Sequence, residues 1–301
     1  STMLDLRKMK KLCRRICGEN NIDFIHARSY ISALAAMNMW RRKKIPYIFD
    51  MRGFWADERI DGGIWSLKNP VFRTVYGFFK KKEKQLLRDA SAVVSLTHTA
   101  KNFMINKWNV PEKKIHVIPC AADYAHFAER DKSVVDEFRL KNHVPVVPGK
   151  TLMYIGSTGT WYMLQDMFDF YAAFRNQFPR SQFVLCINET NSVVEAMKQK
   201  FPYEIIVLQR IPRSEMPLVL SLADYSIMFI KPAFSKMASS PIKLGESLAM
   251  GVPVICNAGV GDLGTIEQEG FGVVVNKASV EEYRQACGRL AVFDFSADDI
   301  R

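Results

Sequence analysis

The chain has 301 residues, of which 48% are hydrophobic and 24% are charged. This composition is typical of a folded protein and excludes a disordered chain, a collagen and a coiled coil. At about 100–200 residues per domain, the length predicts two domains. No uninterrupted apolar run approaches the roughly 18 residues that span a bilayer. Charges interrupt residues 1–8 at once, so they do not resemble a secretory signal.

The net charge of +11 is distributed unevenly. Residues 1–149 carry 28 basic and 15 acidic side chains, whereas residues 150–301 carry 14 and 16. This asymmetry predicts that the first half faces an anionic partner. A phosphorylated small molecule, a nucleic acid and an acidic lipid surface all qualify.

The first half alternates short apolar segments with amphipathic ones. Strands are expected at 22–26, 45–49, 92–96 and 114–119, and helices at 4–17, 29–43, 69–89 and 98–107. Short apolar strands separated by helices indicate βαβ units and a parallel sheet. Four strands without a preceding glycine-rich turn predict a domain that is small or lacks its first strands, and we expect the second case.

The alternation restarts after a segment, 143–149, whose prolines and glycine fit an inter-domain linker. The expected domains are therefore 1–142 and 150–301. In the second domain, strands are expected at 151–155, 182–187, 204–208, 225–230, 253–256 and 272–275. Helices are expected at 162–177, 191–200, 213–223, 241–250, 262–269 and 279–291. This pattern is typical of a doubly wound α/β domain.

Six scattered cysteines and five histidines show no metal-ligand spacing. We therefore expect no metal site. The cysteines are expected to be reduced thiols of a cytoplasmic protein.

The most informative stretch is residues 239–255, SSPIKLGESLAMGVPVI. Ser240 is a good N-cap and the next residue, a proline, suits the first helical position. Lys243 and Glu246 are three apart, so they share a face near the helix N-terminus, where a doubly wound sheet places its ligand crevice. A lysine and helix amides attract phosphate, and a carboxylate accepts hydrogen bonds from a vicinal diol such as ribose. The alternative is an exposed ion pair with no ligand.

A second stretch, residues 153–162, leads from a strand through Gly156 and Ser157 into a helix. Such a turn can present backbone amides to a phosphate. The stretch is neither a P-loop nor a complete dinucleotide fingerprint. A plain strand-to-helix turn is the alternative.

The run Ser-Pro-x-Lys-x-x-Glu-x-x-Ala-x-Gly-x-Pro-Val-Ile resembles the donor-binding signature of glycosyltransferase family 4, the retaining GT-B enzymes. Further landmarks of that family lie at 22–29, 45–58, 90–95, 117–127 and 154–157. The resemblance implies a GT-B-like α/β protein: two Rossmann-like doubly wound parallel-sheet domains facing a cleft, here with an incomplete N-terminal domain. The N-terminal domain would hold the acceptor and the C-terminal domain a nucleotide-diphosphate sugar.

The resemblance also implies roles for individual donor-side residues. Glu246 would bind the donor ribose, Lys243 and the helix amides would lie near the diphosphate, and Gly156 and Ser157 would line the phosphate side. Arg210 and Ile211 would lie near the base, and Ser240 belongs to the same signature. The family needs no metal or other cofactor.

Three positions depart from the family pattern. Ala238 stands where many members have a second glutamate, no Lys or Arg occurs from 151 to 174, and Arg52 stands near the place of a common histidine. Lys243 and Arg210 are expected to replace the missing basic pair.

On the acceptor side, Arg28, Asp50 and Arg52 follow predicted strands, so they are expected to face the ligand edge. Asp50 and Arg52 are the catalytic candidates, and loop salt bridges are the alternative for all three. The resemblance implies attack on the leaving-group face with retention, which requires no side-chain nucleophile, and none is nominated.

Residues 4–17 predict a basic amphipathic helix, with Leu6, Leu12 and Ile16 on its apolar face. Such a helix can dock reversibly on anionic lipid. The prediction is a cytoplasmic enzyme, peripheral at the inner face of the membrane, with a lipid-linked or polysaccharide acceptor. A helix that only packs on the core is the alternative.

The sequence thus predicts a retaining, metal-independent glycosyltransferase. One alternative is a nucleotide-sugar epimerase on the same fold, which would need no acceptor. Another is a non-catalytic module that binds membrane or nucleic acid, although no nucleic-acid recognition motif is present and no nucleic-acid partner is expected.

Overall fold

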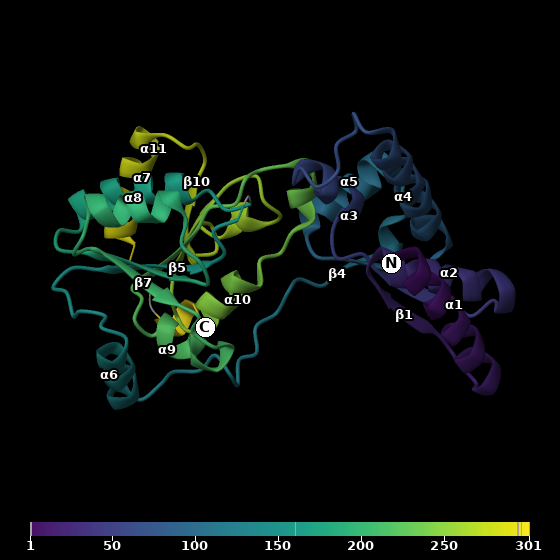
Figure 1. Cartoon of the computed structure of the whole chain (residues 1–301), viewed down its shortest axis with the longest axis horizontal. Helices are drawn as coiled ribbons and strands as arrows, with labels where there is room; N and C mark the ends of the chain where they lie inside the picture. Colours follow the sequence, from purple (N-terminus) through teal and green to yellow (C-terminus); the bar gives the residue numbers. More distant parts are fainter. Residues whose placement is uncertain (1, 160, 294, 296, 301) are drawn as a thin grey trace. The chain divides into compact units, whose positions relative to one another are not determined.

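The structure, a computed structural model, describes residues 2–159, 161–293, 295 and 297–300. The chain divides into two compact units. The first runs to Pro119 and also contains Ala233–Ser240, and the second comprises Cys120–Pro232 and the chain from Pro241 onward. Each unit contains one parallel sheet (Figure 1).

The boundary lies at Pro119, before the segment 143–149 that the sequence suggested as a linker. Residues 120–142 lie in the second unit because their aromatic side chains are buried there. Phe127 packs in a cluster with Leu220 and Ala249, and Phe138 packs in a cluster with Met153 and Val184.

The first unit has a four-stranded sheet in the order β1-β2-β3-β4. Its strands are β1 (Ile25–Arg28), β2 (Tyr47–Asp50), β3 (Ala92–Ser95) and β4 (Ile115–Val117). Its helices are α1 (Thr2–Glu19), α2 (Ser29–Lys43), α3 (Trp55–Asp61), α4 (Pro70–Asp89) and α5 (His98–Trp108), with short 3-10 turns η1 (Glu112–Lys114) and η3 (Phe234–Ala238). Helix α2 contacts both α1 and α4 (Figure 1). The expected parallel sheet is confirmed, with β1 starting three residues later than predicted.

The second unit has a six-stranded sheet in the order β10-β9-β8-β5-β6-β7. Its strands are β5 (Thr151–Gly156), β6 (Gln182–Ile187), β7 (Ile205–Gln209), β8 (Tyr225–Met228), β9 (Val254–Asn257) and β10 (Gly272–Val275). All pairings between these six strands are parallel. All residues of β6, β8, β9 and β10 are buried, as expected for strands covered on both faces.

Helices cover both faces of this sheet, which makes the unit doubly wound. They are α6 (Lys132–Lys141), α7 (Leu164–Gln177), α8 (Ser192–Lys200), α9 (Met216–Leu220), α10 (Ile242–Ala249), α11 (Val280–Val292) and α12 (Ala297–Ile300), with 3-10 turns η2 (Arg213–Glu215) and η4 (Leu263–Thr265). Helices α7, α8 and α11 pack in one core cluster, and α6 and α9 pack in another (Figure 1).

The helix predicted over 262–269 is wrong, because only the turn η4 forms there. Glycines at 261, 264 and 270 lie within or beside the segment, and Gly261 and Gly270 have positive φ angles of 47° and 78°. Glycine within a helix costs about 1 kcal/mol relative to alanine, so the apolar pattern alone does not sustain a helix.

Candidate functional site

The sheet order of the second unit creates a switch point beside β5. The chain passes from β5 outward to β6 and β7 and then returns to β8 on the other side of β5. In open α/β sheets, ligands bind outside the carboxyl ends of the strands at such a point. The structure has a pocket of about 300 Å³ at this place.

The pocket brings together residues that lie far apart in the sequence. It is lined by Ile155, Gly156, Ser157, Cys186, Ile187, Asn188, Ile211, Met216 and Lys243. Four of the seven predicted donor-side residues are therefore neighbours: Gly156, Ser157, Ile211 and Lys243.

The turn after β5 is shaped by a tyrosine on the same strand. The buried Tyr154 hydroxyl donates a 2.7 Å hydrogen bond to the carbonyl oxygen of Ser157. A Cβ atom on Gly156 would overlap this hydroxyl, so only glycine fits at that position. The glycine is thus required by the packing of the turn, which leaves Ser157 exposed at the pocket.

Lys243 lies in the first turn of α10, on the wall of the pocket. Its Nζ donates to the Tyr162 hydroxyl at 3.2 Å and lies 4.8 Å from the centre of that ring. The helix begins at Ile242, and Pro241 occupies the N-cap position. The prediction that Ser240 caps α10 is therefore wrong: Ser240 lies one residue further out and is grouped with the first unit.

Glu246 lies one turn further along α10 and is 6% exposed. Arg213 Nη1 approaches its Oε1 to 2.8 Å. The N–H is not directed at that oxygen, and Oε1 accepts no hydrogen bond from the described residues. A buried carboxylate with an unused acceptor is uncommon, because burying such an atom costs about 1–3 kcal/mol. It can accept hydrogen bonds from the hydroxyl groups of a ligand.

Arg213 is a functional candidate that the sequence did not single out. It lies in η2, and its guanidinium carbon stands 5.4 Å from the centre of the Phe127 ring. Its carbonyl oxygen lies 3.1 Å from His126 Nε2. Its position shortly after β7 is the available signal, but the sequence offers Arg210 at the same strand end and favours it.

Arg210 and Gly245 are not among the residues that line the pocket. Arg210 is exposed, has a φ of 56° and does not line the pocket. A Cβ on Gly245 would stand 3.4 Å from the backbone nitrogen of Ala122. Gly245 therefore permits the close approach of a neighbouring segment of the same unit.

Cys186 is the one thiol on the pocket wall. Burial raises its pKa to about 11, and the charge of Lys243 opposes this shift. At neutral pH the side chain is therefore a thiol, which is a poor nucleophile.

The first unit carries the predicted acceptor-side residues at the carboxyl edge of its own sheet. Arg28 and Asp50 end the neighbouring strands β1 and β2 and are register partners. The Asp50 side chain is buried, with Oδ2 3.4 Å from His26 Nε2 and Oδ1 without a hydrogen bond from the described residues. Arg52 follows with a φ of 58° and is half-buried.

No group of three or more His, Cys, Asp or Glu side chains suited to a metal ion occurs in the described part of the chain. Within the same residues, no helix is both long and apolar enough to cross a membrane.

Comparison with known proteins agrees with this geometry. Residues 3–126 match the model of Glycosyltransferase Family 4. No curated protein matches the chain by sequence.

Among solved structures, a glycosyltransferase from Rickettsia africae is 17% identical, with a TM-score of 0.70 over 98% of this chain and 74% of that one. Alr3699/HepE of Anabaena, in complex with UDP and glucose, is 13% identical, with a TM-score of 0.69 and coverage of 98% and 74%. WaaG, a glycosyltransferase involved in lipopolysaccharide biosynthesis, is 14% identical, with a TM-score of 0.62 and coverage of 90% and 76%.

These structures share the GT-B fold, and at such identities they establish the fold of this chain. The match to the family 4 model covers residues 3–126, and the fold of the chain is that of GT-B glycosyltransferases.

Proposed function

We propose that the enzyme transfers a sugar from a nucleotide-diphosphate sugar, bound in the pocket of the second unit, to a lipid-linked or polysaccharide acceptor. The observation that carries the proposal is Glu246, a buried carboxylate with an unused acceptor oxygen, one helical turn from a lysine on the pocket wall. Similar structures solved with UDP and glucose support this choice of donor.

In this proposal each donor group meets a matching protein group. The ribose hydroxyls donate to Glu246, and Lys243 with the first amides of α10 neutralises the diphosphate. Because the departing diphosphate gains negative charge as the sugar bond breaks, these positive groups stabilise the transition state more than the ground state. The amides of the Gly156–Ser157 turn would contribute in the same way.

The proposed reaction proceeds with retention and without a metal. Lys243 and the helix dipole would supply the positive charge that a metal ion gives to other transferases. On the first unit, Asp50 is the proposed acceptor-binding group, because its free Oδ1 can accept a hydrogen bond from a hydroxyl.

The proposal is tested by thermal unfolding of the full chain with UDP, GDP and ADP, each as diphosphate and as sugar conjugate. A nucleotide at about 100 times its Kd should add about 2.7 kcal/mol of stability. The rise should vanish in Glu246→Ala and persist in Glu269→Ala, which removes an exposed glutamate of the same unit. No rise with any nucleotide would overturn the proposal.

We also propose that the enzyme works at an anionic membrane surface on the cytoplasmic side. Helix α1 supports this, because Leu4, Leu12 and Ile16 are 58%, 47% and 41% exposed among its basic residues. Apolar side chains beside lysines and arginines suit the boundary between headgroups and acyl chains. Co-flotation with anionic vesicles, lost in Leu12→Ser/Ile16→Ser, would support docking; absence of co-flotation at low salt would exclude it.

A further inference from the structure

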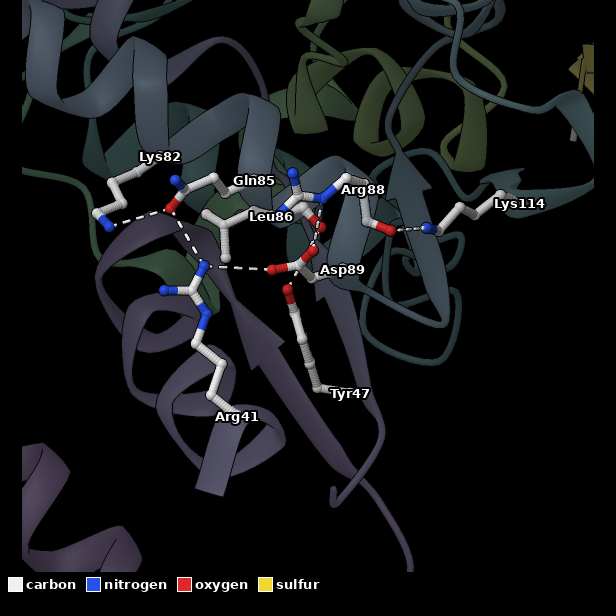
Figure 2. Close-up of polar contacts among 8 residues, drawn as sticks. All are labelled: Arg41, Tyr47, Lys82, Gln85, Leu86, Arg88, Asp89 and Lys114. Carbon is white, nitrogen blue, oxygen red and sulfur yellow. Dashed lines mark hydrogen bonds and ion pairs between the residues drawn. The ribbon is translucent and has the colours of Figure 1, made fainter. Parts of the chain in front are cut away.

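The first unit contains a cavity of about 520 Å³, and all of its lining residues belong to that unit. It is lined by the last turns of α4 and α5 and by the loop that leads into β4. Its lining residues are Lys84, Leu87, Arg88, Lys107, Trp108, Asn109, Val110, Pro111 and Lys114. Two of them, Arg88 and Lys114, are drawn in Figure 2.

The cavity lies at the amino edge of the sheet. Helices α4 and α5 end there, and β3 and β4 begin there. Arg28, Asp50 and Arg52 lie at the opposite, carboxyl edge, because they end or follow β1 and β2. The cavity is therefore separate from the proposed acceptor-side residues.

The lining has four cationic side chains and no carboxylate. Within the described residues, neither Lys84 nor Lys107 has an ion-pair or hydrogen-bond partner for its ammonium group. Arg88 is different, because its Nε donates to Asp89 at 2.8 Å. Like charges around one cavity repel one another, and a bound anion would remove that cost.

Lys114 has a structural role that the other two lysines lack. Its Nζ donates a 2.6 Å hydrogen bond to the carbonyl oxygen of Arg88, a residue in the last turn of α4 (Figure 2). This bond supplies a partner for one of the carbonyl groups at the end of that helix. Burial lowers the pKa of Lys114, and the charge of Asp89 opposes this shift. An anion in the cavity would favour the charged form of Lys114 further.

An aromatic wall adds a second kind of recognition. Trp108 is half-buried, with the Lys80 ammonium 4.7 Å from its ring centre and the Phe54 ring at 5.1 Å. Its indole N–H has no acceptor in the described part of the chain. Leu87 and Val110 lie with Trp108 on an apolar part of the cavity wall. An inorganic ion would make no favourable contact with this part of the wall.

We propose that this cavity binds an organic phosphate, either a phosphate ester or a diphosphate. Lys84, Lys107 and Arg88 would contact the phosphate oxygens, with the organic part against Trp108. The same chemistry is offered by a soluble phosphorylated metabolite and by a phospholipid headgroup, so the experiment uses one probe for each source.

The test follows the Trp108 indole N–H signal by NMR while pyrophosphate is added to the full chain at constant ionic strength. Trp108→Phe assigns the signal. A saturable shift is expected, and Lys84→Ala/Lys107→Ala should weaken binding about tenfold or more, as expected for two charge-assisted hydrogen bonds. Lys200→Ala/Lys277→Ala is the matched control, because it removes two exposed lysines from the second unit.

The lipid arm uses flotation with phosphatidylcholine vesicles, with and without phosphatidic acid, and the same variants. If the Lys84→Ala/Lys107→Ala variant loses binding of pyrophosphate, the ligand is a soluble phosphate. If the variant loses only its binding to phosphatidic acid vesicles, the ligand is a lipid headgroup. The proposal is overturned if neither probe binds, or if both lysine pairs weaken binding equally. Should the alanine pair misfold, judged by the other indole signals, Lys84→Gln/Lys107→Gln replaces it with the same expected outcome.

Discussion

Arg213 and Glu246 form an ion pair in which the guanidinium is exposed and the carboxylate is buried. The Nη1–Oε1 distance is 2.8 Å, and the side chains are 60% and 8% exposed. The long arginine can move at little cost, whereas Glu246 is held by the packing of α10. A ligand can therefore take the place of the arginine at Oε1, or share that oxygen with it.

The first prediction concerns the ribose contact of Glu246. Glu246→Gln should weaken binding of the favoured nucleoside diphosphate by about 1.5–3 kcal/mol, the usual value of a hydrogen bond to a charged group. If the carboxylate binds the diol, the 2′-deoxy nucleotide should bind weakly to the wild type. The Glu246→Gln substitution should then lower its affinity only slightly further. Calorimetric titration of both ligands with both proteins gives the coupling.

Arg213→Ala provides the complementary variant. It removes the cation but leaves the carboxylate, so the preference for the ribonucleotide over its 2′-deoxy form should persist. Equal losses for both nucleotides in Glu246→Gln would contradict the assignment of Glu246 to the ribose.

The second prediction concerns Lys243. Lys243→Ala should weaken binding of the nucleoside diphosphate about tenfold or more and leave binding of the parent nucleoside unchanged, because the ammonium faces only the phosphates in the proposed pose. Titrations at two salt concentrations should also show a shallower salt dependence in the variant. Lys200→Ala removes a charge remote from the pocket and serves as the control.

The donor side was partly predictable because its signals are local. Lys243 and Glu246 are close in sequence on one helix, and Gly156 ends a clearly apolar strand. Arg213 could not be found in this way, because its contact with Glu246 depends on how the segment after β7 folds back towards α10. The same holds for Ala122, which approaches Gly245 only in the folded unit.

The acceptor side and the boundary were less predictable for a related reason. Strand positions predicted that Arg28 and Asp50 lie at the ligand edge, but not that they are register partners on neighbouring strands. The burial of Phe127 and Phe138 in the second unit depends on long-range packing that periodicity does not report. Periodicity therefore predicts residues 120–142 in the first domain, whereas they belong to the second unit.

The third prediction compares two glycines of the pocket region. Gly156→Ala should destabilise the protein by about 1–3 kcal/mol and weaken nucleotide binding, because the new Cβ overlaps Tyr154. Gly245→Ala meets only a 3.4 Å contact, and alanine favours the helix by about 1 kcal/mol, so its net effect should be small. Urea unfolding of both variants decides between these outcomes, and equal destabilisation would contradict the packing role of Tyr154.

The fourth prediction concerns Asp89, which lies between two guanidinium groups (Figure 2). Its carboxylate accepts from Arg88 Nε at 2.8 Å and from Arg41 Nη2 at 3.3 Å. Burial raises the pKa of Asp89, but the hydrogen bonds and charges of Arg88 and Arg41 outweigh it, and the net pKa is lowered.

A carboxylate with a lowered pKa in the folded state stabilises that state above its ordinary pKa of about 3.9, and the contribution is lost as the pH falls through the lowered value. The stability difference between wild type and Asp89→Asn should therefore shrink from pH 7 to pH 3. Urea unfolding followed by tryptophan fluorescence measures it, since four of the five tryptophans, Trp40, Trp55, Trp65 and Trp108, lie in the first unit. Glu112→Gln, which removes an exposed carboxylate of the same unit, controls for general charge effects. A difference that stays constant with pH would show that Arg41 and Arg88 hold Asp89 no more strongly than water does.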